Sequence, residues 1–447
     1  MFQNLRFDVG NSEIIREYQL LLAYRLFCLF NYPLWKLILV LRKAKGKEHR
    51  DRYIEKLGFG YLPRPEGEVI WVHALGLGET LSLTLFLQKL SSFNKDKTVL
   101  FTSSTLQSYE AFSKLNLNSN ILHQFAPIDN TGAIKSFLNH WKPSISLISE
   151  LDLWPNRILE ISKLNIPLVL FNTRMNKRKR DSRKAIFSIF KKTLSFLDFI
   201  FLQDEASVRN FEFFGVPIYK MKVIGPFKTA GSIMAKDHKL SKILRKWAKK
   251  KFVWIAASIH QDEEVEVLEA FKLTKRILPN LALIIVPRYI ELSNITEKRC
   301  KTYTESIYTR KSNNNYPDQA TDILLVSTVG ELGVFYDIAD IAFVGNSLDY
   351  KKIKTGKNPF EAIQRNCVVM HGPKMLEPSY SLPSKEGITE IVQNRFDISE
   401  CLQKYYSVEQ RGPKVKLGAD FIRRNQTIIE DFIFETSKLI EKGTRKL

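Results

Sequence analysis

The feature of this sequence that most constrains its fold is a regular alternation of short apolar runs with longer amphipathic stretches. The first runs, rich in β-branched and aromatic residues, occupy residues 69–74, 98–104, 121–127, 144–150, 167–173 and 198–203. Continuous apolar runs separated by helix-length segments are typical of parallel strands in a sheet covered by helices on both faces. The pattern therefore predicts a doubly wound α/β domain.

A second series of such runs follows at residues 252–258, 281–287, 322–327, 341–345 and 367–372. A charged, weakly patterned stretch divides the two series, and Gly225-Pro226 marks the expected hinge. Since 447 residues are enough for two domains, we expect two Rossmann-like domains facing a cleft. We expect an N-terminal segment at 1–48, the two domains at 49–228 and 229–420, and a C-terminal helix at 421–447 that packs back on the first domain.

The N-terminal residues 18–41 are strongly apolar, but Arg25, Asn31, Pro33 and Lys36 interrupt them and the basic stretch "RKAKGKEHRDR" follows. A spanning helix needs about 20 predominantly apolar residues. The pattern favours a helix lying in the bilayer interface, with basic residues facing lipid phosphates. Two alternatives stay open: a spanning anchor whose charges extend to the surface, and a packing helix of the first domain. No small-residue cleavage site follows, so we expect no removed signal peptide.

Composition narrows the class of partner. The net charge of +21 indicates an anionic partner, whether nucleic acid, a phosphorylated metabolite or an acidic membrane surface. The four cysteines lack CxxC or CxxH spacing, which argues against a zinc module or a disulfide framework and favours a reducing cytoplasmic setting. The seven histidines form no HxxxH or HExxH pair. We therefore predict no catalytic metal.

The stretch "WVHALGLGET" at residues 71–80 follows the first predicted strand, at the edge where ligands of open α/β sheets bind. Gly76 and Gly78 allow tight turns, but Leu81 stands where a dinucleotide fingerprint needs a small residue, and no P-loop lysine is present. Glu79 falls in the first turn of a predicted helix. Its carboxylate either complements the helix dipole or acts as a general base toward an acceptor hydroxyl.

The C-terminal half carries further candidates after its strands. Gly330 precedes a predicted helix whose amides could receive phosphate oxygens. Asn358-Pro359 starts another helix and places Glu361 in its first turn, where a carboxylate can accept both hydroxyls of a ribose or simply complement the dipole. Arg288 ends a strand as either a clamp for a phosphate or carboxylate or a surface arginine.

A basic run begins at Arg174 and continues to Lys192 as "RMNKRKRDSRKAIFSIFKK", with nine basic residues and one acid. Such a run is either a solvated face or, beside a cleft in a membrane-associated protein, a site for a phosphorylated lipid.

Taken together, the motifs resemble those of the 3-deoxy-D-manno-octulosonic acid (Kdo) transferases of lipopolysaccharide assembly, which have the GT-B fold. The matching stretches run in order over nearly the whole chain: "GKEHRDRYIEKLG", "WVHALGLGET", "APID", "ISELDLWPN", "FNTRMNKRKRDS", "LQDEASVRNFEFFGVP", "VIGPFK", "AASIHQDEE", "VPR", "STVGELGVFYDIADIAFVGNSL" and "NPFEA". Their order and spacing make the resemblance specific.

The resemblance implies a metal-independent, inverting transfer of Kdo from CMP-Kdo to the lipid A precursor, with no cofactor, at the cytoplasmic face of the inner membrane. It implies that Glu79 is the catalytic base. The implied substrate-binding residues are Arg174, Ser258, His260, Arg288, Gly330, Glu331, Leu332, Ser347, Asn358 and Glu361, all except Arg174 in the CMP-Kdo-binding half. The first domain would bind the acceptor.

The chain departs from the family pattern at two places. The family's histidine and proline after the proline-arginine pair are here Tyr289 and Ile290, and its glycine-glycine-histidine-asparagine is here Thr355-Gly356-Lys357-Asn358. Lys357 retains a donor group but adds a fixed charge, so we expect altered donor contacts.

Two rival functions remain at this stage. One is a different GT-B enzyme that uses a nucleoside-diphosphate sugar, which would share the fold but leave the apolar N-terminus beside a basic run unexplained. The other is a nucleic-acid-binding protein, which would carry exposed aromatics interleaved with basic residues. Because the aromatics here fall mostly in strand and anchor patterns, we expect no nucleic acid partner.

Overall fold

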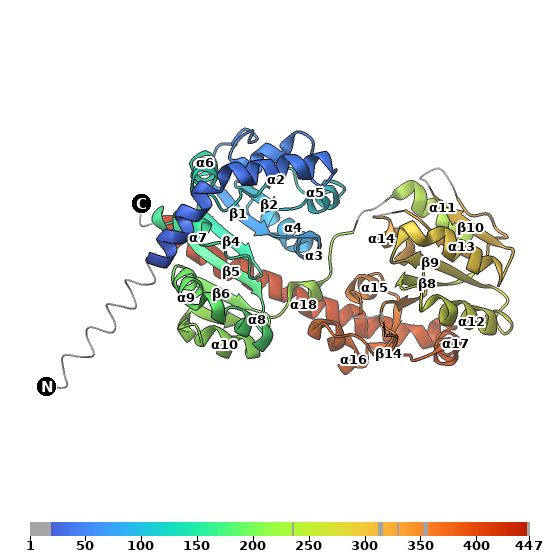
Figure 1. Cartoon of the computed structure of the whole chain (residues 1–447). Helices are drawn as coiled ribbons and strands as arrows, with labels where there is room; N and C mark the ends of the chain where they lie inside the picture. Colours follow the sequence, from blue (N-terminus) through green and yellow to red (C-terminus); the bar gives the residue numbers. More distant parts are fainter. Residues whose placement is uncertain (1–18, 235–236, 312–315, 329, 352–355, 445–447) are drawn as a thin grey trace. The chain divides into compact units, whose positions relative to one another are not determined.

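The computed structural model describes residues 19–234, 237–311, 316–328, 330–351 and 356–444. The chain divides into two compact units, unit 1 with Met1–Phe227 and Thr427–Leu447, and unit 2 with Lys228–Gln426. Each unit is built around its own parallel sheet (Figure 1).

The sheet of unit 1 has the strand order β3-β2-β1-β4-β5-β6-β7, with every pair parallel. Its strands are β1 (Val69–Ala74), β2 (Thr98–Ser103), β3 (Ile121–Phe125), β4 (Ile145–Ser149), β5 (Leu168–Thr173), β6 (Phe199–Leu202) and β7 (Met221–Val223). The order in which the strands are connected reverses between β1 and β4. Ligands of open α/β sheets bind at the carboxyl ends of the strands at such a switch point.

The helices of unit 1 cover this sheet and bury its apolar runs. They are Gln19–Phe30, α2 (Tyr32–Ala44), α3 (Leu77–Ser82), α4 (Thr84–Phe93), α5 (Leu106–Ser113), α6 (Thr131–Trp141), α7 (Pro155–Lys163), α8 (Lys177–Ser182), α9 (Phe187–Ser195) and α10 (Glu205–Glu212). Side chains accept hydrogen bonds from the free amides at several helix starts; Asn130 caps α6 and Asp204 caps α10 in this way.

The sheet of unit 2 has the strand order β10-β11-β9-β8-β12-β13-β14, and every pair is parallel. The order in which the strands are connected reverses between β8 and β12, which form the switch point of this sheet. Its strands are β8 (Phe252–Ile259), β9 (Leu281–Pro287), β10 (Ile307–Arg310), β11 (Ile323–Val326), β12 (Ile341–Val344), β13 (Val368–His371) and β14 (Thr389–Ile391). Its helices are α11 (His238–Ala248), α12 (Glu264–Lys275), α13 (Ser293–Lys301), α14 (Leu332–Tyr336), α15 (Phe360–Gln364), α16 (Leu382–Lys385), α17 (Arg395–Lys404) and the first part of α18 (Val408–Thr444).

The last part of α18 belongs to unit 1, because the division falls between Gln426 and Thr427. There the ring of Phe432 stacks on the ring of Phe171, with 4.9 Å between the ring centroids. It also makes edge-to-face contacts with Phe86 and Phe227, at centroid distances of 5.4 and 5.3 Å. Such aromatic contacts add to the stabilisation from burying the rings. Residues from the end of the chain thus complete the core of the first unit.

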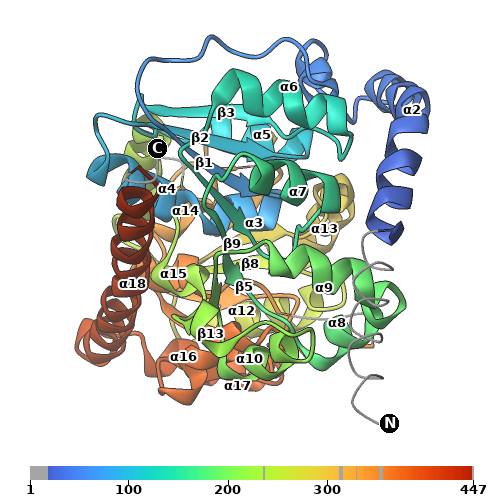
Figure 2. The ribbon, with the colours of Figure 1, turned by 90° about the vertical axis from the view of Figure 1, so that its left-hand side faces the viewer.

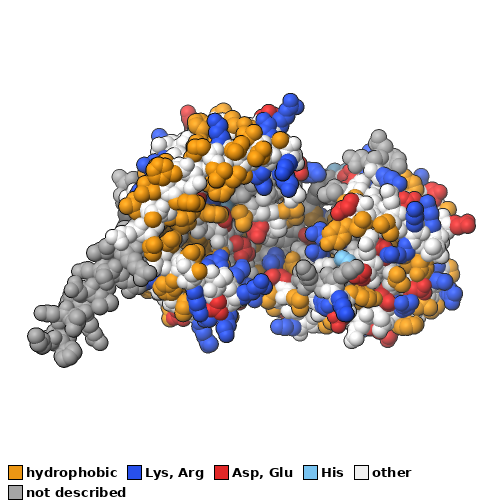
Figure 3. Space-filling model, viewed as in Figure 1, with side chains coloured by type: hydrophobic (Ala, Val, Ile, Leu, Met, Phe, Trp, Pro, Cys, Tyr) orange, Lys and Arg blue, Asp and Glu red, His pale blue; other side chains and the backbone are white. Residues whose placement is uncertain are grey.

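The two N-terminal helices have one packed face and one exposed face. On the packed side, the Tyr24 hydroxyl donates to Asp129 at 2.8 Å, Arg25 pairs with Glu160 of α7 at 2.8 Å, and Leu21 and Cys28 are buried. The exposed side is a continuous apolar stretch, which we call the outer apolar face; it consists of Leu22, Leu26, Phe27, Leu29, Phe30, Leu34, Trp35, Leu37 and Leu41. Figure 2 shows the two helices at the margin of unit 1, and Figure 3 shows apolar side chains gathered over them.

No single described helix combines the length and apolarity needed to cross a bilayer. The helices Gln19–Phe30 and Tyr32–Ala44 meet that requirement only as a pair, and they are bent by 53° at their junction.

The two parallel sheets confirm the predicted fold class, and every strand expected from the apolar runs is present. Three short strands, β7, β10 and β14, were not predicted. Each lies at the edge of its sheet and has only three or four residues. An edge strand needs fewer apolar residues because a neighbour covers it on one side only, so its sequence lacks the signal of a central strand.

Candidate active site

The Glu79 carboxylate lies on α3, directly after the loop that leaves β1. The Gly76 backbone lies close to the Glu79 carboxylate, because a Cβ atom added at Gly76 would lie 3.1 Å from Glu79 Oε2. Thr80 holds the helix start, since its hydroxyl donates to the Gly76 carbonyl at 2.9 Å. Glu79 is half-buried, and its carboxylate forms no ion pair or hydrogen bond with any described residue. A carboxylate placed in this way can accept a proton from a bound molecule.

A buried polar network lies beneath this loop. The ring of His73, at the end of β1, lies 2.8 Å from the Thr102 hydroxyl and 2.7 Å from Asp152 Oδ2. Asp152 also accepts hydrogen bonds from Arg157 at 2.7 Å and from the Trp154 indole at 2.8 Å. Because an ionised carboxylate only accepts, His73 Nε2 carries the proton and Nδ1 accepts from Thr102.

The charges in this network are set by burial and by Arg157. Burial alone would raise the pKa of Asp152, but Arg157 and His73 outweigh it and hold that pKa well below its usual range. Burial, together with Arg157, lowers the pKa of His73. The network is therefore an Asp152–Arg157 ion pair joined to a neutral histidine, and it ties the end of β1 to the loop after β4.

The backbone is strained at the same edge of both sheets. Four non-glycine residues that follow or end strands have left-handed φ values: Glu150 (59°), Asn172 (49°), Ser258 (56°) and Asn346 (57°). They lie at the carboxyl ends of β4, β5, β8 and β12. Of these strands, β4, β8 and β12 border a switch point, and β5 is the neighbour of β4. Strained backbone of this kind clusters at functional sites, in agreement with the predicted ligand edge.

Arg174 follows β5 and pairs with Asp204 at 2.7 Å, so its charge is already balanced within unit 1. The basic run continues through α8, where Asn176 caps the helix and Lys177 and Arg178 are exposed.

In unit 2, two cations approach each other without a carboxylate partner among the described residues. Arg288 follows β9 and is exposed, with its guanidinium 6.0 Å from the Tyr289 ring. Burial, and secondarily the charge of Arg288, lowers the pKa of the half-buried Lys357. Two neighbouring cations repel each other unless an anion binds between them. The pair is thus a candidate site for a phosphate or carboxylate.

Glu361 and Asn358 form a second pair nearby in the sequence. Asn358 Nδ2 donates to Glu361 Oε1 at 3.3 Å, and Asn358 Oδ1 accepts from the Phe360 amide at 3.0 Å. Burial raises the pKa of Glu361 to about 7, and the hydrogen bond from Asn358 only partly offsets this. Among the residues the structure describes, no cation pairs with Glu361, so its oxygens remain available to hydroxyl donors.

The turn Gly330-Glu331-Leu332 is held by hydrogen bonds between Glu331 and Arg310. Gly330 has a φ of 88°, a conformation suited to glycine. The Glu331 carboxylate takes two hydrogen bonds from the fully buried Arg310, at 2.9 and 2.7 Å. Leu332 opens α14, which has only five residues. Glu331 therefore holds the turn in place, and a ligand here would meet the backbone.

Ser347 is fully buried, with its hydroxyl donating to the Val344 carbonyl at 2.7 Å and accepting from the Gly372 amide at 2.8 Å. Its hydroxyl thus points into unit 2. A buried carboxylate, Glu263, accepts hydrogen bonds from the amides of His260 at 2.8 Å, Ser347 at 2.8 Å and Leu348 at 3.0 Å.

Glu263 thereby links the loop after β8 to the loop after β12 through hydrogen bonds. The strands β8 and β12 border the switch point of unit 2. Ser258 lies near the end of β8, and His260 follows the strand on the first of these loops. The sequence motif "AASIHQDEE" contains Glu263, but nothing in it distinguishes this acid from its neighbours. Arg310 was likewise missed, because its role depends on a partner 21 residues away.

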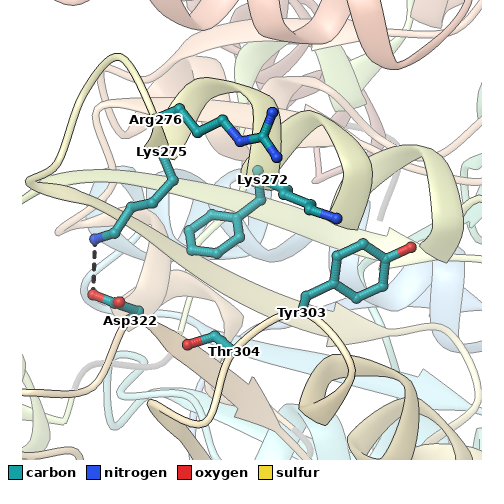
Figure 4. A pocket seen from close by; sticks show the side chains of 7 residues that line it. Lys272, Lys275, Arg276, Tyr303, Thr304 and Asp322 are labelled. Atoms are coloured by element: carbon teal, nitrogen blue, oxygen red, sulfur yellow. Dashed lines mark hydrogen bonds and ion pairs between the residues drawn. The ribbon is translucent and has the colours of Figure 1, made fainter.

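A separate cavity of about 220 Å³ lies at the other edge of the unit 2 sheet (Figure 4). It is lined by Lys272 and Lys275 of α12, by Arg276 directly after that helix, and by Asp322, which accepts a hydrogen bond from Lys275 at 2.9 Å. Asp322 directly precedes β11, so the cavity is at the amino ends of the strands. Ligands of open α/β sheets bind at the opposite edge.

Of the predicted residues, Glu79 and Arg174 lie in unit 1 and the others in unit 2. Within unit 2 the structure brings together Asn358 with Glu361, and His260 with Ser347 through Glu263.

Known proteins are similar in sequence to most of this chain. Residues 51–230 match the family model described as "3-Deoxy-D-manno-octulosonic-acid transferase (kdotransferase)". The chain is 32% identical over 359 residues to an Arabidopsis thaliana protein named "Probable 3-deoxy-D-manno-octulosonic acid transferase, mitochondrial", covering 78% of this chain and 79% of that one. It is 30% identical over 356 residues to the 3-deoxy-D-manno-octulosonic acid transferase of Haemophilus influenzae, covering 78% and 81%.

A solved glycosyltransferase of Rickettsia africae has the same fold, with a TM-score of 0.55 at 10% identity over 85% of this chain and 99% of that chain. This likeness shows a GT-B architecture of two Rossmann-like domains. The sequence relationship is closer and more specific. The chain therefore belongs to the 3-deoxy-D-manno-octulosonic acid transferase family of glycosyltransferases.

Proposed function

We propose that this enzyme transfers Kdo from CMP-Kdo to a hydroxyl of the lipid A precursor, with inversion at the anomeric carbon. The observation that carries the proposal is the Glu79 carboxylate, half-buried at the carboxyl end of β1 and without an ionic partner among the described residues. Unit 1 would bind the lipid acceptor and unit 2 the donor.

In the proposed step, Glu79 takes the proton of the acceptor hydroxyl as that oxygen bonds to the anomeric carbon of Kdo. The bond from the anomeric carbon to the CMP phosphate oxygen breaks, and its electron pair leaves with CMP. Because the hydroxyl attacks from the face opposite to CMP, the configuration inverts.

The residues of unit 2 suit the donor's charges. CMP-Kdo carries a phosphate and a sugar carboxylate, and Arg288 and Lys357 offer two cations that pair with no carboxylate in the described part of the chain. A guanidinium can bind either anion through two parallel hydrogen bonds, and positive charge stabilises the departing phosphate. Glu361, whose carboxylate accepts a hydrogen bond from Asn358, would accept the ribose hydroxyls.

We further propose that the outer apolar face rests in the interface of the inner membrane, at its cytoplasmic side. Large apolar side chains, Phe30 among them at 77% exposure, would leave water there. Arg42, Lys43, Lys45 and Lys47 follow on the same segment and would face anionic lipid phosphates.

The test is mass spectrometry of the products formed by the full chain from CMP-Kdo and the tetra-acylated, bis-phosphorylated glucosamine disaccharide. We expect a lipid heavier by Kdo and stoichiometric release of CMP. Parallel reactions contain UDP-N-acetylglucosamine in place of CMP-Kdo. Turnover of the UDP-sugar without any Kdo-bearing lipid would refute the proposal and favour the rival GT-B chemistry.

A further inference from the structure

We infer that a cavity in unit 1 is a subsite for one acyl chain of the acceptor lipid, with Arg183 binding a phosphate of the same molecule. The inference rests on the proposed function. The cavity, of about 430 Å³, lies between the helix Gln19–Phe30, the loop after β4 and the segment from Ser182 to Thr193. Its size is within the range of small-ligand sites. Its apolar wall includes Leu151, Leu153, Trp154, Ile186, Ile189 and Phe190.

The position of this acyl cavity agrees with the chemistry proposed for Glu79. Residues 151–155 of its wall follow β4, and β4 is the direct neighbour of β1, the strand that leads to Glu79. Because β1 and β4 are parallel and both segments follow the strand ends, the cavity wall and Glu79 lie toward the same edge of the sheet. An acceptor anchored in the cavity would therefore present its head group along the edge that carries the proposed base.

The cavity also adjoins the membrane-facing part of the chain. Tyr24 of the helix Gln19–Phe30 lines it, while other residues of the same helix form the outer apolar face. Two large apolar side chains stand exposed at the cavity, Ile186 at 51% and Trp154 at 46%. A fatty chain would cover both, and it has a short path from the bilayer along the helix.

Arg183 places a positive charge at the wall of this otherwise largely apolar cavity. Its guanidinium donates to the Lys179 carbonyl at 2.9 Å and lies 5.2 Å from the Phe190 ring. No described carboxylate pairs with it, and burial lowers its pKa. A half-buried cation without a counter-charge is stabilised by a bound anion. A cation beside an apolar wall thus fits an anionic amphiphile better than a soluble phosphate or a neutral hydrocarbon.

The first experiment measures KM with the full chain in detergent micelles. Ile186→Glu places a charge at the cavity, and Ile189→Trp fills it. We expect either change to raise the KM for the tetra-acylated acceptor about tenfold, which corresponds to roughly 1.4 kcal/mol, and to leave the KM for CMP-Kdo unchanged. The matched control is Ile218→Glu, at an isoleucine of unit 1 that is 64% exposed outside the cavity. An unchanged acceptor KM, or an equal rise for both substrates, would overturn the subsite.

The second experiment tests Arg183. Arg183→Gln should weaken binding of the bis-phosphorylated acceptor several-fold more than binding of its dephosphorylated analogue, whereas Arg178→Gln on the exposed surface of α8 should not discriminate. Equal weakening of both ligands would refute the assignment.

A third measurement separates the acceptor from ordinary membrane lipid as the occupant. If the cavity variants lose binding to acceptor-free phosphatidylethanolamine–phosphatidylglycerol vesicles while their acceptor KM in micelles is normal, the occupant is a membrane phospholipid and the inference is wrong. Failure of the proposed function is distinct, because then the wild-type chain would form no Kdo-bearing product.

Discussion

Two glutamates at helix starts, Glu79 and Glu361, have different surroundings and therefore different proposed roles. Glu79 is half-buried beside a glycine turn and has no partner among the described residues. Glu361 is held by Asn358 in surroundings that disfavour its charge. The first suits proton transfer, and the second suits acceptance of hydroxyl hydrogens.

Glu79→Gln removes the proposed base and keeps the size of the side chain. Since general-base catalysis contributes about 10²–10⁴-fold, we expect kcat to fall by at least about 100-fold, with the KM for CMP-Kdo nearly unchanged. Steady-state kinetics with the lipid acceptor provide the measurement. Glu110→Gln, at an exposed position of α5, is the control and should behave as wild type. Wild-type turnover by Glu79→Gln would exclude the base.

Glu361 should make stability depend on pH. Its folded pKa of about 7 is higher than its ordinary value of 4.5. The folded chain therefore holds this proton more tightly than the unfolded chain does, and the ionised group lowers stability as pH rises from 4.5 through about 7.

Glu361→Gln should accordingly raise the thermal midpoint of the ligand-free chain on the order of 3 °C at about pH 8 and leave it almost unchanged at about pH 4. Circular dichroism scans at the two pH values test this. A gain that is equal at both would show that ionisation is not the cause.

At the scale of elements, the buried network joins β1 to α7 across the switch point. Asp152 links His73 of β1 to Arg157 of α7, and Asp129 accepts from the Asn156 and Arg157 amides at 3.1 and 2.8 Å at the start of α7. Tyr24 donates to the same Asp129. These contacts hold the loop before Glu79 in place, which the proposed catalytic role of Glu79 would require.

Asp152→Asn should be costly, because it leaves the buried Arg157 without its counter-charge. The loss is about 3–5 kcal/mol for a broken buried pair, measurable by urea denaturation at neutral pH. Since the folded pKa of Asp152 is depressed, its contribution is present above the unfolded pKa and lost as pH falls through the folded one. Asp181→Asn removes surface ion pairs with Arg180 and Lys184 and should change stability little. Equal effects of the two substitutions would contradict the buried-pair argument.

At the scale of the whole molecule, the outer apolar face is an exposed apolar surface at the margin of unit 1 (Figure 3). Monomeric soluble proteins rarely expose apolar patches of this kind without a partner. The net charge of +21 favours an anionic surface beside it.

The triple substitution Phe27→Ser, Phe30→Ser and Leu34→Ser should weaken binding to phosphatidylethanolamine–phosphatidylglycerol vesicles by about tenfold or more, because it removes apolar area from the interface. Vesicle sedimentation provides the measurement. Phe93→Ser on α4, 67% exposed, is the matched control and should bind normally. Undiminished sedimentation of the triple variant would refute the membrane assignment.

The amino-acid sequence by itself determined the central strands, the two-domain fold class and the placement of Glu79 after a glycine turn. These features depend on local periodicity and turn chemistry, which a short window of residues expresses. The edge strands β7, β10 and β14 escaped prediction because pairing with a neighbouring strand, rather than their own apolarity, holds them.

Only the tertiary structure decided which polar groups are already occupied. Glu331 pairs with Arg310, and the Ser347 hydroxyl bonds to backbone groups inside unit 2. Glu263 links two loops through their amides. Phe432 packs against Phe86, Phe171 and Phe227, which precede it in the chain by about 200 positions or more. Each depends on contacts between residues distant along the chain, and the free energy of such contacts arises from burial and geometry that no local pattern encodes.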